Sequence, residues 1–122
     1  MNAKILIVDD SALARRTLRS ILESAGHSVA EAEDGVNALE RYFLDKPDVV
    51  MLDLVMKGMY GLDVLTKLRE LDATARVIVV SADVQSSSHR LVAAAGANGF
   101  INKPVDRERL LSVVHTVLED TC

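Results

Sequence analysis

The 122-residue chain is long enough for one domain with a sizeable core, and its 49% hydrophobic and 26% charged residues are typical of a soluble globular protein. Its formal net charge of −4 argues against nonspecific nucleic-acid binding, which needs clustered Lys and Arg. The lack of a transmembrane-length apolar stretch, the lack of a signal-peptide pattern and the single cysteine, Cys122, together predict a cytoplasmic location.

Strand and helix patterns alternate from the beginning of the chain. The apolar run at residues 4–8 predicts a strand buried on both faces, because such short runs are rich in branched side chains. We expect a helix after it that ends at Gly26. Residues 28–33 predict a more polar strand, and Asp34 can cap the next helix. The apolar faces of these two helices are expected to hold Ala14, Leu18, Ile21, Leu22 and Ala25, and then Val36, Leu39 and Phe43.

The alternation continues to the end of the chain. Residues 48–52 and 76–81 predict buried strands, the first followed by Asp53, and residues 57–61 predict a flexible loop between the first of these strands and the next helix. Residues 99–102 predict a short fifth strand before Lys103-Pro104. Asp106 can cap the last helix. The apolar residues of the last three helices are Leu62, Leu65, Leu68 and Leu71, then Leu91, Val92 and Ala95, then Leu110, Leu111, Val114, Val117 and Leu118.

Burial predicts the order of the strands. The first, third and fourth strands are apolar throughout and should be central, whereas the second and fifth are polar or short and should be edges. With right-handed crossovers, the simplest order is 2-1-3-4-5. We therefore predict an α/β fold, a flavodoxin-like doubly wound five-stranded parallel sheet with five helices. The chain reverses direction between strands one and three, so a crevice should open there.

Three acidic residues are predicted to lie in that crevice. Asp9 and Asp10 follow the first strand and Asp53 follows the third, and the carboxyl ends of parallel strands meet at one edge of the sheet. Carboxylates brought together repel one another unless something binds them. A set of oxygen ligands without His or Cys suits a hard cation such as Mg²⁺. His27, His89 and His115 are scattered along the chain, so we expect no metal or catalytic role for them.

Two further residues should reach the same edge. Ser81 ends the fourth strand with a hydroxyl, and Lys103 follows the fifth with an ammonium group. A metal site, a hydroxyl, a cation and one carboxylate together stabilise charge on a transferring phosphoryl group. Either acid of the pair is a possible acceptor. Asp53 stands alone at the centre of the sheet, so we take it as the nucleophile and the pair as metal ligands.

These residues carry a family resemblance. Asp9-Asp10, Asp53, Ser81 and Lys103-Pro104, in this order and on these elements, resemble the receiver domain of bacterial response regulators, in particular the single-domain, chemotaxis-regulator-like kind. The sequence AGANGFINKP at residues 95–104 matches the family's pattern almost residue for residue. The resemblance spans residues 1–122 and implies one receiver (phosphoacceptor) domain.

The resemblance implies a role in a two-component phosphorelay. Asp53 would accept a phosphoryl group from a phosphohistidine of a sensor kinase or phosphotransfer protein in a Mg²⁺-dependent reaction. Asp9, Asp10, Asp53 and the backbone carbonyl of Val55 would hold the metal. The chain would be a switch and not a turnover enzyme.

The resemblance also assigns the phosphoryl contacts and the output. Ser81 and Lys103 would bind phosphoryl oxygens, and the Lys103–Pro104 bond would be cis. Phe100 is either a core aromatic or the rotating aromatic of the switch, coupled to Ser81. An unknown downstream protein would dock on the face made by the fourth helix, fifth strand and fifth helix. No direct nucleic-acid or membrane partner is expected.

The sequence departs from the family at two positions. Met56-Lys57 replaces the usual Met-Pro, and Tyr60 stands where Asp or Asn is common. Lys57 lets the loop flex more than proline would, but we favour the simpler explanation that it is a solvated lysine. Val55 and Asp83 match positions that tune the phosphoryl lifetime in the family, and the apolar Val55 should slow hydrolysis.

Three alternatives differ in what they require. The chain resembles part of a longer regulator, such as a transcription factor or hybrid kinase, equally well, although its start at Met1 favours a complete protein. A phosphatase of the haloacid-dehalogenase type also phosphorylates an Asp with Mg²⁺, but it needs a second acid where this chain has Val55. A flavin carrier needs a phosphate cradle after the first strand, and Asp9-Asp10 would repel the phosphate.

Overall fold

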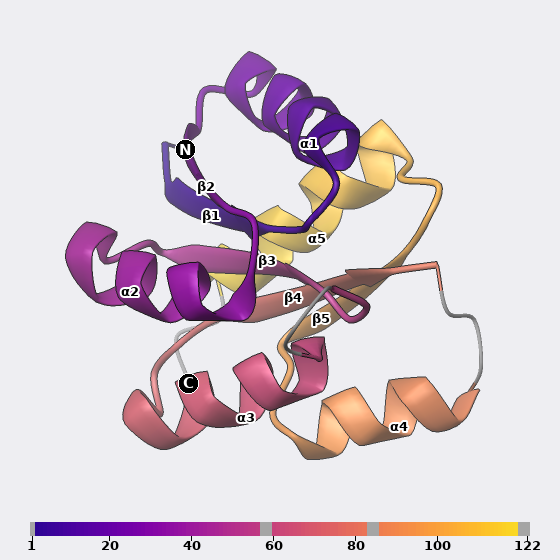
Figure 1. The fold of residues 1–122 in the computed structure, drawn as a ribbon. Helices are drawn as coiled ribbons and strands as arrows, with labels where there is room; N and C mark the ends of the chain where they lie inside the picture. The colour runs from indigo at the N-terminus through magenta and orange to yellow at the C-terminus, as the bar shows by residue number, and fades with distance from the viewer. Residues whose placement is uncertain (1, 57–59, 83–85, 120–122) are drawn as a thin grey trace.

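The computed structural model describes residues 2–56, 60–82 and 86–119, and there it confirms the predicted alternation of five strands and five helices (Figure 1). The strands are β1 (Lys4–Val8), β2 (Ser28–Ala32), β3 (Val49–Asp53), β4 (Val77–Ser81) and β5 (Gly99–Asn102). The helices are α1 (Ala12–Ser24), α2 (Gly35–Asp45), α3 (Gly61–Leu71), α4 (Ser86–Ala94) and α5 (Arg107–Glu119). Lys57, Asp83 and Cys122, which the sequence singles out, lie outside the described residues.

The sheet has the predicted order, β2-β1-β3-β4-β5, and all pairs are parallel. Every residue of β3 and β4 is buried, whereas β2 at one edge is mostly half-buried, as its polar sequence predicts. The strands pair in register, so that Val8 lies beside Leu52 and Asp53 beside Val80. The carboxyl ends of the strands are therefore level with one another, which brings together the polar residues that end them.

Helices cover both faces of the sheet (Figure 1). One core joins buried residues of α2, α3 and α4 to alternate strand residues such as Leu6 and Leu52. The other joins α1 and α5 to the intervening residues, such as Ile7 and Met51. Because successive side chains of a strand point to opposite faces, each apolar run supplies both cores. None of the helices in the described ranges is long and apolar enough to cross a membrane.

The predicted helix caps are present. The Asn37 backbone N–H donates to Asp34 Oδ1 at 2.8 Å, and the Arg109 N–H donates to Asp106 Oδ2 at 3.1 Å. Each bond satisfies an N–H group that the first turn of a helix leaves without an intrahelical partner. Gly26 follows α1 with φ +95°, a conformation that favours glycine. These residues fix where the helices begin and end.

The predicted apolar face of α2 is wrong. Val36 and Phe43 are exposed, and the helix instead buries Ala38 and Tyr42. The exposed pair and the buried pair both have helical spacing, so packing decides which face of α2 is turned inward. The small Ala38 side chain lets the helix approach the sheet closely. The Tyr42 hydroxyl donates to Asp72 Oδ2 at 2.7 Å, at the end of α3. Leu71 and Leu91, expected on the inner faces of α3 and α4, are also exposed.

The two adjacent aromatics of α2 provide a test of this orientation. Tyr42→Ala should lower the free energy of unfolding by about 3 kcal/mol, because it leaves a cavity and removes the bond to Asp72. Phe43→Ala should lower the free energy of unfolding by about 1 kcal/mol, mainly because it removes the edge-to-face contact of this ring with Tyr42. Urea denaturation of the two variants measures both values. Equal losses, or a larger loss for Phe43→Ala, would contradict the orientation.

Candidate functional site

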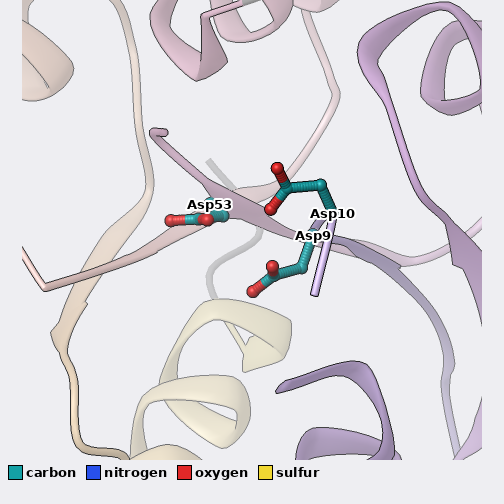
Figure 2. Close-up of side chains that lie close together, drawn as sticks. All are labelled: Asp9, Asp10 and Asp53. Carbon is teal, nitrogen blue, oxygen red and sulfur yellow. The ribbon is translucent and has the colours of Figure 1, made fainter. Parts of the chain in front are cut away.

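The three acids predicted from the strand ends do meet. Asp9 directly follows β1 and Asp53 is the last residue of β3, while Asp10 begins the loop into α1. One carboxylate oxygen from each lies within 4.8 Å of the others. Figure 2 shows the three side chains gathered at this edge of the sheet. Asp9 and Asp53 are buried, with 2% and 8% of their surface exposed, whereas Asp10 is exposed. The cluster is therefore buried on one side and open to solvent on the other.

Lys103 supplies a positive charge to the cluster. Its Nζ lies 2.9 Å from Asp9 Oδ2 and 3.7 Å from Asp53 Oδ2, so one ammonium group bridges the two buried carboxylates. The backbone places it there, because the Lys103 N–H donates to the Ser81 carbonyl at 2.8 Å. The Lys103–Pro104 peptide bond is cis, as predicted. The β5–α5 connection thus returns across the ends of the strands to reach the acids.

The pKa of Asp53 is raised above its usual value. Burial is the largest cause, and the charges of Asp9 and Asp10 add to it, while Lys103 and a hydrogen bond from the Val55 backbone N–H oppose it. A carboxyl group whose pKa is raised by burial and by like charges binds a proton or a cation more readily than one in water. A divalent cation is therefore favoured beside Asp53 on electrostatic grounds.

The donor set suits such a cation. Within the described residues, Asp9, Asp10 and Asp53 are the group of acidic, His or Cys side chains close enough to bind one ion together. All three offer oxygen atoms, which Mg²⁺ prefers, and three carboxylates leave room for the waters that this ion retains. His27 and His115 lie away from the cluster, where they contact Ala3 and Glu119. The residues present thus fit a hard divalent cation.

A close backbone contact supports the Asp53 end of the site. The Gly61 N–H donates to the Leu54 carbonyl at 2.8 Å, which brings the beginning of α3 against the end of β3. A Cβ atom at Gly61 would lie 2.2 Å from the Asp53 carbonyl oxygen, well inside van der Waals contact. Only glycine fits here without moving the backbone of Asp53. From the sequence alone, Gly61 is expected only as part of a flexible loop.

The remaining predicted residues occupy neighbouring positions. Ser81 is the last residue of β4 and is 1% exposed. Val55 is exposed, two residues beyond Asp53. Phe100 is half-buried on β5 and its ring lies 3.6 Å, centroid to centroid, from that of His89. This contact is not predictable from the sequence, in which His89 carries no signal of a particular role.

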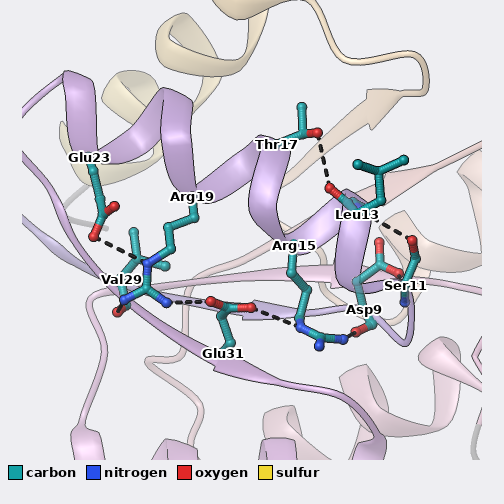
Figure 3. Close-up of polar contacts among 10 residues, drawn as sticks. Asp9, Ser11, Leu13, Arg15, Thr17, Arg19, Glu23, Val29 and Glu31 are labelled. Carbon is teal, nitrogen blue, oxygen red and sulfur yellow. Dashed lines mark hydrogen bonds and ion pairs between the residues drawn. The ribbon is translucent and has the colours of Figure 1, made fainter.

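The sequence alone does not single out Arg15 and Glu31, which lie next to Asp9 in the fold. Arg15 Nη1 donates to the Asp9 carbonyl at 2.8 Å, and Arg15 Nε donates to Glu31 Oε1 at 2.9 Å (Figure 3). The Ser11 N–H donates to Asp9 Oδ1 at 2.9 Å. A signal was present in the sequence, since Glu31 is a charged residue between two alanines of a predicted strand. Such a residue needs a cationic partner when it is half-buried.

The chain is similar to a large set of known proteins. The family model described as response regulator receiver domain matches residues 5–115. The chemotaxis protein CheY of Bacillus subtilis is 40% identical over 119 residues, which are 97% of this chain and 99% of that protein. Protein PilH of Pseudomonas aeruginosa is also 40% identical over 119 residues, 95% and 98% of the two chains.

Solved structures agree with the sequence relatives. The chain is similar to one in the crystal structure of the CheX–CheY–BeF₃–Mg²⁺ complex of Borrelia burgdorferi, with a TM-score of 0.91 and 35% sequence identity. The similarity covers 96% of this chain and 90% of that one. The shared fold therefore extends over nearly the whole of both chains.

The raised pKa of Asp53 predicts that its negative charge destabilises the metal-free fold. The cost is absent at pH values below the ordinary pKa of aspartate, and it grows as pH rises through the higher pKa of the folded protein. Asp53→Asn should therefore melt a few degrees above the wild type at neutral pH. The difference should narrow as pH falls toward about 4.

Thermal unfolding followed by circular dichroism across this pH range, in buffer with a metal chelator, measures the effect. Glu70→Gln is the matched control, because it neutralises one exposed acid of α3. Equal melting temperatures of Asp53→Asn and wild type at neutral pH would show that the buried charge costs nothing.

Proposed function

The chain belongs to the family of response regulator receiver domains, and from that premise we propose that Asp53 is its phosphoryl acceptor. The donor would be the phosphohistidine of a sensor histidine kinase or of a phosphotransfer protein. The observation that carries the proposal is the arrangement around the Asp53 carboxylate: Asp9 and Asp10 each bring an oxygen close to it, and the Lys103 ammonium group lies between Asp9 and Asp53. The domain would extend over residues 1–122.

Asp53 is better placed than Asp9 or Asp10 to be the nucleophile. It ends the central strand β3, and its carboxylate accepts a hydrogen bond from the Val55 N–H, which orients the group. The Asp9 carboxylate is already engaged by the Ser11 N–H and by Lys103. In the transfer, an Asp53 oxygen would form a bond to phosphorus while the P–N bond breaks, leaving its electron pair on the imidazole of the donor.

The other residues of the site would stabilise the charge that develops. Lys103, between Asp9 and Asp53, can turn its ammonium group toward a phosphoryl oxygen, and Ser81 ends the neighbouring strand with a hydroxyl. Asp9, Asp10, Asp53 and the Val55 carbonyl would hold Mg²⁺, which supplies further charge neutralisation when bound. Positioning and electrostatics account for most of the catalysis of phosphoryl transfer, so no further acid or base is required.

A switch in partner binding would follow from the added charge. Phosphorylation introduces about two negative charges beside Ser81 and the end of β4. Phe100 lies on β5, next to β4, and its half-buried ring has space to change its packing. The similar CheY of Borrelia burgdorferi was crystallised with CheX, BeF₃ and Mg²⁺, which supports a phosphorylation-dependent partner here. We assign the partner surface to α4, β5 and α5, as the family resemblance implies.

This function makes the chain a switch and not a turnover enzyme. It would catalyse only its own phosphorylation and dephosphorylation. A phosphatase of the haloacid-dehalogenase type would need an acid two residues after the nucleophile, and that position holds Val55, which is 64% exposed. The chain covers nearly the whole length of the similar chemotaxis protein and of PilH.

The phosphorylation site can be tested without a kinase. Incubation of the wild type with acetyl phosphate and Mg²⁺ should add one acid-stable, base-labile phosphoryl group, because the charged site itself promotes the transfer. Asp53→Asn should accept none, and Asp63→Asn, which alters an exposed acid of α3, should react like the wild type. Intact-protein mass spectrometry measures the product. Full phosphorylation of Asp53→Asn would place the acceptor elsewhere.

The coupling between the site and β5 can be tested with Ser81→Ala. Phosphorylation of Asp53 should remain possible, because Lys103 and the acids are unchanged, but the response of Phe100 should be lost. NMR spectra with and without beryllofluoride, a phosphoryl mimic, report the response of residues 91–101. If Ser81→Ala shows the wild-type shift changes there, the signal does not pass through this hydroxyl.

A further inference from the structure

The Arg15 guanidinium connects the acid cluster to the edge of the sheet. It lies between the Asp9 carbonyl and the Glu31 carboxylate, donating to the first through Nη1 and to the second through Nε (Figure 3). Only 16% of its side chain is exposed, although arginine is normally a surface residue. A largely buried arginine with two of its guanidinium nitrogens engaged in hydrogen bonds is held in one orientation.

The contact with Asp9 acts on the acid pair as a whole. The Asp9 carbonyl and the Asp10 N–H belong to one planar peptide unit, so a bond that fixes the carbonyl oxygen also fixes the plane. The Asp9 N–H donates to Ala32 O at 3.2 Å, which holds the other side of Asp9 against β2. Together these bonds restrain the backbone on both sides of Asp9, including the peptide unit from which Asp10 extends. Asp10 is exposed, and its direction decides how its carboxylate faces Asp53.

Glu31 holds Arg15 in place. Burial raises the pKa of Glu31, but hydrogen bonds from Arg19 and Arg15 outweigh this effect, so its pKa lies below the usual value and the carboxylate stays charged at neutral pH. Arg19 in turn donates to the Val29 carbonyl at 3.2 Å and pairs with Glu23. The result is a chain of charge-assisted bonds from α1 through β2 to the backbone of the acid pair.

We propose that Arg15, oriented by Glu31, is a positioning residue that fixes the Asp9–Asp10 peptide and so prepares the acid pair to bind a divalent cation. The inference rests on the proposed function, because it concerns the same cation site. Arg15 contacts the peptide carbonyl of Asp9, so it acts through the backbone of the pair. Lysine has one donor group in place of a planar fork and cannot keep both bonds in the same geometry.

The test compares Mg²⁺ binding to unphosphorylated wild type, Arg15→Lys and Glu31→Gln. Titration with MgCl₂ followed by ¹H–¹⁵N NMR gives the affinity and, in the metal-free protein, the chemical shift of the Asp10 amide. Arg16→Lys is the matched control on α1, where Arg16 is exposed, and Glu33→Gln is the matched control for Glu31. Asp10→Asn, which removes one of the ligands, is the reference for a damaged site.

We expect Arg15→Lys to weaken Mg²⁺ binding about tenfold, a typical effect of losing a group that orients a metal ligand. The Asp10 amide should shift in the metal-free variant, because the hydrogen bond to its own peptide unit is lost. Glu31→Gln, which keeps Arg15 but loosens it, should shift the same amide in the same direction and weaken binding less. The two controls should bind Mg²⁺ within about twofold of the wild type, as expected for exposed charges screened by solvent.

If Arg15→Lys binds Mg²⁺ with the wild-type affinity, the inference is overturned, because any positive charge at this position would then be enough to prepare the site. An unmoved Asp10 amide in that variant would overturn it too, even if binding weakens. If the wild type itself does not bind Mg²⁺ at the acid cluster, the proposed function fails and the inference fails with it. If the wild type binds Mg²⁺ and both Arg15→Lys and Glu31→Gln bind it equally well, the inference is wrong but the proposed function stands.

Discussion

Mutual repulsion among Asp9, Asp10 and Asp53 is the constraint on which the rest of this structure depends. Two of the three carboxylates are buried, and the pKa of Asp53 is raised by burial and by its acidic neighbours. Holding such charges together costs free energy in the absence of a cation. Lys103 offsets part of that cost by reaching both buried carboxylates. A divalent cation bound at the cluster would offset more of this cost.

Three contacts on the backbone keep this arrangement in place. The Lys103 N–H binds the end of β4, Gly61 brings α3 against Asp53, and Arg15 binds the carbonyl of Asp9. Each contact acts on the backbone near an acid or its counterion, and Ser11 binds the Asp9 carboxylate directly. A site that stabilises a developing charge works best when its groups need little rearrangement during the reaction.

The same arrangement suits a switch. Added charge at Asp53 would change the balance among Lys103 and the acids, and β4, which pairs with both β3 and β5, connects Asp53 to the strand that carries Phe100. Phe100 is half-buried there against His89, in contrast with the fully buried side chains at the centre of the sheet. An element with two packings of similar energy can be shifted by a local change in charge. Under the proposed function, the chemistry would take place at the buried strand ends and the response at the half-buried Phe100.

The sequence by itself determined the fold, the order of the strands and the edge at which Asp9, Asp10, Asp53 and Lys103 meet. It did so because apolar runs report buried strands and the ends of parallel strands share one edge. Only the tertiary structure decided that α2 buries Tyr42 and exposes Phe43, because two helical faces had equally good spacing and close packing selected one. It alone also brought Arg15 to the Asp9 carbonyl and His89 to Phe100. Long side chains reach several partners, and which one they meet depends on how helices lie on the sheet.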